Sequence, residues 1–156
     1  MGLRKTGKTI VLALAATLAL GSSAGAPRAG LLTRTGDVIA IMAGDLFLGT
    51  AEGDYWGAGT LAIHAQQDPS VTCTGDFTSS KELGGKGQLR CTDGASATFR
   101  FDRLTILRGH GDGTFSRGPM SFTYGLTAEE SLPYLKLPPG KRLGYNGTTL
   151  ELVAAE

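Results

Sequence analysis

The chain is poor in the residues from which most enzyme and metal sites are built. Its 156 residues include two cysteines, Cys73 and Cys91, and two histidines, His64 and His110. The cysteines do not form a Cys-x-x-Cys pair, so a thioredoxin-like redox site is not supported. A structural zinc ion needs about four ligands, and besides the two cysteines the chain offers only the two histidines. We therefore predict no metal site and no bound cofactor.

No apolar run is long enough for a membrane-spanning helix, which needs about 20 residues. The apolar stretch at residues 9–20 follows a basic segment and precedes the small residues Ala24-Gly25-Ala26. This three-part layout is typical of an export signal. We predict a signal peptide at residues 1–26, cleaved after Ala26 or Ala24, and an exported protein that is periplasmic or secreted if bacterial. No cysteine lies near the cleavage site, which disfavours a lipid anchor, and we expect no stable transmembrane anchor after processing.

The chain also lacks an excess of either charge. It has 15 Lys and Arg against 14 Asp and Glu, and the signal contains Arg4, Lys5 and Lys8 but no acid, which leaves 15 − 3 = 12 basic residues against 14 acidic ones. Such a surface has no broad positive field for a phosphate backbone, so we expect no nucleic-acid partner. The mature part is long enough for one core. We predict a linker at 27–36 and a single β-rich domain at 37–156.

Glycine, by contrast, is abundant, with 24 residues in the whole chain. The motif Gly-x-Gly-x-apolar occurs three times, at 57–61, 85–89 and 111–115. A strand places residues i, i+2 and i+4 on one face. Each motif therefore leaves one face of a strand bare beside an apolar residue, and a large side chain from a neighbouring strand can lie across it.

Two cysteines in an exported protein favour a disulfide, here across a β-hairpin. If Cys73 lies opposite Cys91 in antiparallel strands, the register places Gly75 opposite Leu89 and Phe77 opposite Gly87. Phe77 would then cover a bare glycine. A disulfide closing a loop of this length contributes roughly 3 kcal/mol to stability in the chain-entropy model.

This hairpin resembles a known repeat. Residues 73–94 contain Cys-x-Gly-x-Phe, then Gly-x-Gly-x-Leu-x-Cys-x-Asp-Gly, which is similar to the MORN repeat. Cysteines stand where the repeat usually has tyrosines, and the glycine expected near Ser80 is missing. Residues 47–61 form a fainter second copy. The chain also resembles small exported bacterial β-rich proteins of unknown function, with residues 118–125 similar to their closing strand. The resemblance implies a β-hairpin meander and carries no catalytic residue.

The rest of the chain favours an all-β fold. Short runs rich in strand formers are separated by Gly, Asp, Pro and Ser, which predicts an antiparallel meander that forms a small barrel or a sandwich. The predicted strands are 38–42, 45–50, 60–65, 71–78, 87–92, 97–104, 113–116 and 120–124. Period-two patterning places the following residues on the core face: Leu61, Ile63, Val71, Cys73, Phe77, Leu89, Cys91, Phe99, Phe101, Phe122 and Tyr124.

One segment, near residues 127–135, favours a short helix. Thr127 and Glu130 have the spacing of a capping box, and Pro133 prevents a long continuation. Leu132 and Leu135 would lie on one face of this helix, where they could plug the end of a barrel. We expect a stiff loop at residues 137–143 and a last edge strand at 148–153.

Candidate catalytic residues are few. His110 and Asp112 stand two apart between glycines, so both would project from the same face of a strand, where a general base is conceivable. The favoured interpretation is a polar outward face, because no nucleophile is tied to them. His64, with Asp68 and Ser70 nearby, is not a triad on sequence proximity alone. We assign no catalytic residue.

The aromatic pair Tyr55-Trp56 is the most suggestive binding feature, at the tip between two predicted strands. Large aromatic residues at such a tip are either tucked under the sheet or offered to a partner. We predict an exported, noncatalytic envelope protein that binds a protein, glycan or lipid through a sheet face or this tip. Tyr55, Trp56, His110 and Asp112 are the possible binding residues. The alternative is a small extracytoplasmic hydrolase or hydrolase inhibitor.

Overall fold

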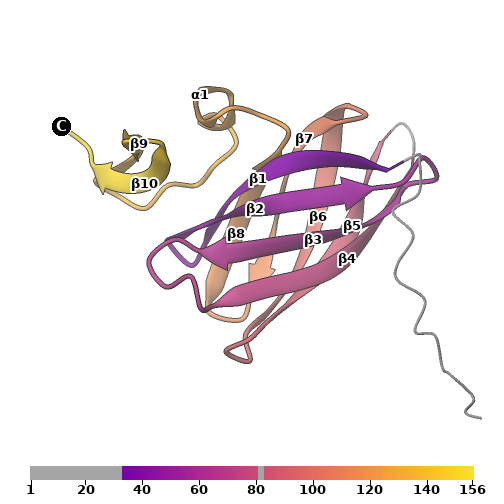
Figure 1. The fold of residues 1–156 in the computed structure, drawn as a ribbon, viewed down its shortest axis with the longest axis horizontal. Helices are drawn as coiled ribbons and strands as arrows, with labels where there is room; N and C mark the ends of the chain where they lie inside the picture. Colours follow the sequence, from indigo (N-terminus) through magenta and orange to yellow (C-terminus); the bar gives the residue numbers. More distant parts are fainter. Residues whose placement is uncertain (1–32, 81–82) are drawn as a thin grey trace, which may run out of the picture.

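Eight antiparallel strands follow one another around a closed barrel, so of the two predicted architectures the barrel is the one formed (Figure 1). The computed structural model describes residues 33–80 and 83–156, and the predicted signal peptide lies outside them. The first strand begins inside the predicted linker. The strands are β1 (Arg34–Met42), β2 (Asp45–Gly53), β3 (Ala58–Ala65), β4 (Thr72–Ser80), β5 (Gly84–Cys91), β6 (Ser96–Thr105), β7 (Arg108–Phe115) and β8 (Gly118–Tyr124).

The barrel closes where β1 pairs with β8, with Val38 opposite Tyr124 and Met42 opposite Met120. Period-two alternation then sends one face of every strand inward. In β6, for example, Ala97, Phe99 and Phe101 are buried while the residues between them are exposed. The predicted core residues all line this interior. Val71, Phe77 and Tyr124 are half-buried against it, and the others are buried.

The disulfide and the register of its hairpin are as predicted. Cys73 and Cys91 are bonded across β4 and β5, 18 positions apart in the chain. Gly75 lies opposite Leu89, and Phe77 opposite Gly87. The disulfide is consistent with an oxidising, exported location.

Aromatic rings lie over the bare strand faces in all three glycine motifs, although one ring differs from the expectation. Phe77 of β4 was expected to cover Gly87 of β5, but its ring leans the other way, over Gly59 of β3. A Cβ at Gly59 would be 2.3 Å from the Phe77 Cζ. Gly87 is covered by Phe99 of β6, whose Cζ would be 2.4 Å from a Cβ there. In the third motif Phe122 lies over Gly111. Glycines thus make room for rings that lean across neighbouring strands.

The chain after β8 packs on the outside of the barrel. The helix α1 (Ala128–Ser131) has the predicted capping box between Thr127 and Glu130. It does not plug the barrel: Leu132 is 46% exposed, and Leu135 is buried against the outer faces of β1 and β2. This outer cluster explains why residues 38–42 of β1 are buried on both faces. Its buried members are Ile39, Ile41, Leu46, Leu135 and Leu150.

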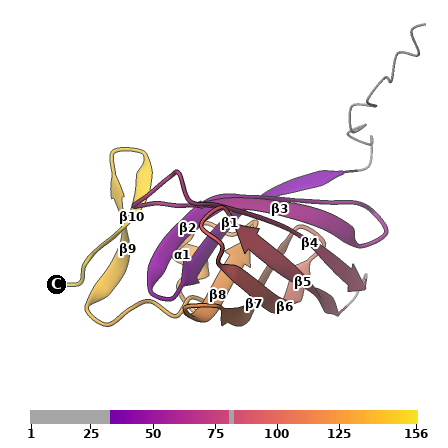
Figure 2. The same cartoon turned by 90° about the horizontal axis from the view of Figure 1, so that it is seen from below.

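The chain ends in a second, two-stranded sheet formed by β9 (Lys141–Asn146) and β10 (Thr149–Ala154). The stiff loop predicted for 137–143 is therefore wrong at its C-terminal end, where β9 starts after the turn at Gly140. The predicted last strand exists as β10, but it pairs with β9 rather than with an edge of the barrel. Figure 2 shows this hairpin beyond one end of the barrel.

Candidate functional site

The two ends of the barrel differ in how the interior is filled. We call the end bearing residues 92–95 and 116–117 the closed end, and the end bearing residues 54–57 and 106–107 the open end. At the closed end large side chains meet across the interior, with Phe47 and Phe115 in an edge-to-face contact at 6.3 Å between ring centroids. Met42 and Met120 are almost completely buried beside them. Large buried side chains therefore fill the interior at this end.

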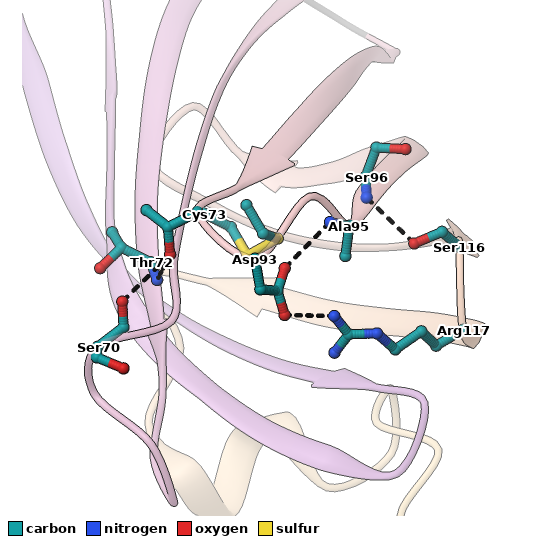
Figure 3. The surroundings of a disulfide bond; sticks show 10 residues. Ser70, Thr72, Cys73, Asp93, Ala95, Ser96, Ser116 and Arg117 are labelled. Atoms are coloured by element: carbon teal, nitrogen blue, oxygen red, sulfur yellow. Dashed lines mark hydrogen bonds and ion pairs between the residues drawn. A yellow bond between two sulfur atoms is a disulfide. The ribbon is translucent and has the colours of Figure 1, made fainter.

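The closed end is also tied together by the disulfide and its surroundings (Figure 3). Asp93, in the turn after β5, accepts hydrogen bonds from the backbone N–H of Ala95 and from the Arg117 guanidinium. Its pKa is lowered by these contacts, the Arg117 hydrogen bond above all. The turn between β7 and β8 is thereby joined to the turn between β5 and β6.

The open end contains a cavity of about 330 Å³. Its walls are mainly aromatic and aliphatic, and they come from strands on all sides of the barrel. They leave space because inward positions at this end carry glycine, for example Gly36 and Gly53. The apolar walls include Leu61, Phe77, Phe99, Phe101, Phe122 and the ring of Tyr124.

The polar residues that line this cavity include Arg103 of β6 and Tyr124 of β8. Arg103 Nε and the Tyr124 hydroxyl are buried, and neither forms a hydrogen bond within the described chain. Burial raises the pKa of the Tyr124 hydroxyl, while the nearby Arg103 charge lowers it in part. An unpaired buried polar group costs free energy, so these two atoms need an explanation.

The predicted aromatic tip stands at the mouth of this cavity. Tyr55 lines the cavity and is 57% exposed, and its neighbour Trp56 is 73% exposed. Both are in the loop between β2 and β3, which is shaped by Asp54: its carboxylate accepts from the backbone N–H of Trp56 and of Ala58 at 2.9 Å each. The tip is therefore exposed rather than tucked under the sheet, and its binding role stays a prediction.

His110 and Asp112 lie elsewhere, on the outer surface of β7. They share one face, but each contacts the segment that follows α1. His110 stacks on the ring of Tyr134 with 4.0 Å between centroids, and Asp112 forms an ion pair with Lys136 at 3.7 Å. The pair thus fastens the C-terminal segment to the barrel, and the cavity does not include it.

The other chemical candidates are not assembled into a site. Ser70 donates its hydroxyl hydrogen to Asp68 at 2.5 Å within the turn after β3, and among the described residues neither bonds to His64. Across 33–80 and 83–156 there is no group of three His, Cys, Asp or Glu side chains placed to hold a metal ion. None of the helices in those ranges has the length and apolar character needed to cross a bilayer.

No family model, curated protein or solved structure matches this chain. The site must therefore be judged by its geometry, and the resemblance to MORN repeats stays a prediction. Sequence reasoning included Tyr124 only as a core residue and missed Arg103. A signal was present, because Arg103 continues the inward series Ala97, Phe99 and Phe101 at period two. A charged residue in an otherwise apolar, inward-facing series is unusual, because arginine is rarely buried without a partner. Such a residue indicates a polar site inside the barrel.

Proposed function

We propose that the protein is an exported, noncatalytic binding protein whose barrel takes up a small apolar molecule through its open end. The observation that carries this proposal is the cavity of about 330 Å³ with its aromatic walls. Ligand sites are typically concave, mostly apolar and roughly 300–1,000 Å³ in volume. An eight-stranded barrel is just wide enough to be filled by side chains or to hold one small ligand.

Among the partner classes predicted from the sequence, the cavity favours a lipid-like molecule over a protein or a glycan. A glycan would need many hydrogen-bonding groups, whereas the walls offer mainly rings such as Phe99 and Phe101. The exposed tip, Tyr55 and Trp56, extends this apolar lining to the surface. A hydrolase based on His110 and Asp112 has less support, because Tyr134 and Lys136 contact those side chains.

The proposal is tested with a neutral apolar fluorescent probe, N-phenyl-1-naphthylamine, and its displacement by 1-decanol. We expect saturable binding of the probe to the purified, disulfide-intact protein. Gly53→Leu should weaken it strongly by filling the mouth. A Cβ at Gly53 would lie 3.4 Å from the Phe77 ring, an ordinary contact, so the backbone accommodates the substitution.

The matched control is Thr50→Leu, which places the same side chain on the exposed outer face of the same strand. It should leave binding of the probe unchanged. Absence of saturable binding to the unsubstituted protein, or equal affinity for Gly53→Leu and Thr50→Leu, would show that the cavity is not a binding site.

A further inference from the structure

Arg103 and Tyr124, two residues that line the cavity and each carry a buried, unpaired polar atom, come from one row across three strands. Arg103 of β6 is opposite Gly109 of β7, and Gly109 is opposite Tyr124 of β8. Because Gly109 has no side chain, the ring of Tyr124 lies over it: a Cβ there would be 2.4 Å from the Tyr124 hydroxyl oxygen. The glycine therefore allows this hydroxyl to extend across β7 toward Arg103.

The guanidinium of Arg103 is held from its other side. Its terminal Nη2 donates to the hydroxyl oxygen of Ser79 on β4. Ser79 in turn donates its own hydroxyl hydrogen to the carbonyl oxygen of Gly57 at 3.1 Å. Donation to Gly57 directs the serine hydrogen away from Arg103, so a lone pair of the hydroxyl oxygen is left to accept from the guanidinium. The guanidinium is thus positioned in advance, with its Nε–H buried and still to be paired.

Arg103 forms no ion pair within the described ranges 33–80 and 83–156, where the ion pairs join other residues. Two carboxylates are close in the chain or at the mouth. Asp102 alternates to the exposed outer face of β6, and Asp54 uses Oδ1 to accept two backbone N–H groups of its own loop. A second cation, Arg34, stands at the mouth. The polar part of the site therefore favours an anion.

We propose that the open end binds a monocarboxylate with a single apolar chain, an inference that rests on the proposed function. The carboxylate lies beside Arg103 and Tyr124, which line the cavity, and its oxygens accept from the guanidinium and from the hydroxyl. A carboxylate suits this pair of donors because it is an acceptor at both oxygens and its negative charge complements the positive charge of Arg103. The apolar chain lies among Leu61, Phe77, Phe99 and Phe122. The cavity is at the small end of the usual range, which fits one chain rather than a two-chain lipid.

Isothermal titration calorimetry of the disulfide-intact protein at pH 7.5 tests this with three probes that share a ten-carbon chain: decanoate, 1-decanol and decyltrimethylammonium. We expect decanoate to bind at least about tenfold more tightly than 1-decanol, as charge-assisted hydrogen bonds require. The cation should bind more weakly than either. Equal affinities for decanoate and 1-decanol would overturn the carboxylate assignment but leave the proposed function standing. No binding of any probe would overturn both.

Two variants locate the carboxylate. Tyr124→Phe removes only the hydroxyl and keeps the ring over Gly109, so it should fold and lose several-fold in affinity for decanoate but not for 1-decanol. Arg103→Gln should reduce decanoate binding to the level of 1-decanol. Arg100→Gln, on the exposed face of the same strand, is the charge-matched control and should change nothing. If Tyr124→Phe and Arg103→Gln both bind decanoate as tightly as the unsubstituted protein, the assignment is wrong.

Discussion

The closed and open ends of the barrel are built from the same eight strands but have opposite interiors. At the closed end the inward positions carry residues such as Met42, Phe47 and Phe115, and the space is filled. At the open end several inward positions carry glycine, among them Gly36 and Gly53, and a cavity of about 330 Å³ remains. The same strands pair toward both ends, although the β6–β7 register shifts between Arg103 and Thr105 at the open end. In a barrel of this size, the volume of the inward side chains therefore decides whether a region is filled core or cavity.

The largest expected difference between the ends is in the cost of removing a ring. Phe115→Ala at the closed end should lower the free energy of unfolding by about 3–5 kcal/mol, because it opens a cavity in a filled core. Phe77→Ala at the open end should cost clearly less, since Phe77 is half-buried and already borders a cavity. Urea unfolding of both variants gives the comparison. Equal costs would mean that the two ends are packed alike.

The disulfide should make the next largest contribution, and it acts at the closed end. Replacing Cys73 and Cys91 together by alanine should lower the free energy of unfolding by roughly 3 kcal/mol, the value for a loop of this length. Denaturant unfolding measures the loss. Binding of 1-decanol at the open end, measured where the variant is folded, should be unchanged. A loss of binding with little loss of stability would contradict the separation of the two ends.

The fold was largely predictable because its signals are local. Alternation of apolar residues located the eight barrel strands, and the spacing of Cys73 and Cys91 set the correct register of β4 and β5. The start of β7 was placed too late, at 113 instead of Arg108, since residues 108–112 are polar or glycine and lack strand formers. Those glycines are explained only by the rings of Phe122 and Tyr124 on the next strand, a contact that short-range patterns do not show.

The candidate site was much less predictable than the fold. A cavity exists only once the barrel has closed, and its walls come from strands far apart in the sequence. Tyr55 and Trp56 were predicted as possible binding residues because a pair of aromatic residues in a loop is unusual by itself. Arg103 looked like any charged residue near the end of a strand. Its meaning depends on Gly109 and Tyr124 in the same row, and so on the register of three strands.

A matched pair of glycine substitutions should have smaller effects of opposite sign. A Cβ at Gly53 of the open end would make an ordinary contact with Phe77 at 3.4 Å, so Gly53→Ala should stabilise the protein by about 0.4–1 kcal/mol through the unfolded chain. At Gly111 the Cβ would be 2.2 Å from the Arg100 carbonyl oxygen and 2.6 Å from the Phe122 ring. Gly111→Ala should therefore destabilise, by more than the gain at Gly53. Thermal unfolding of both variants shows whether each substitution stabilises or destabilises the protein. A change in the same direction at both positions would mean that the space beside Gly53 and the space beside Gly111 do not differ as described.

The smallest expected effect is a pH dependence at the rim of the open end. Arg108, at the start of β7, hydrogen-bonds to Glu130 of α1 and, together with the Thr127 cap, lowers the pKa of Glu130 from 4.5 to about 2. Because the folded-state pKa is depressed, the contribution of this contact is fully present above pH 4.5 and is lost as the pH falls toward about 2. Both side chains are exposed, so the effect on overall stability should be slight. An NMR titration of the Glu130 carboxyl should show the low pKa, and Arg108→Gln should raise it toward the ordinary value. A pKa near 4.5 in the unsubstituted protein would mean that the Arg108–Glu130 contact does not form in solution. The open end would then lack the contact that joins α1 to its rim.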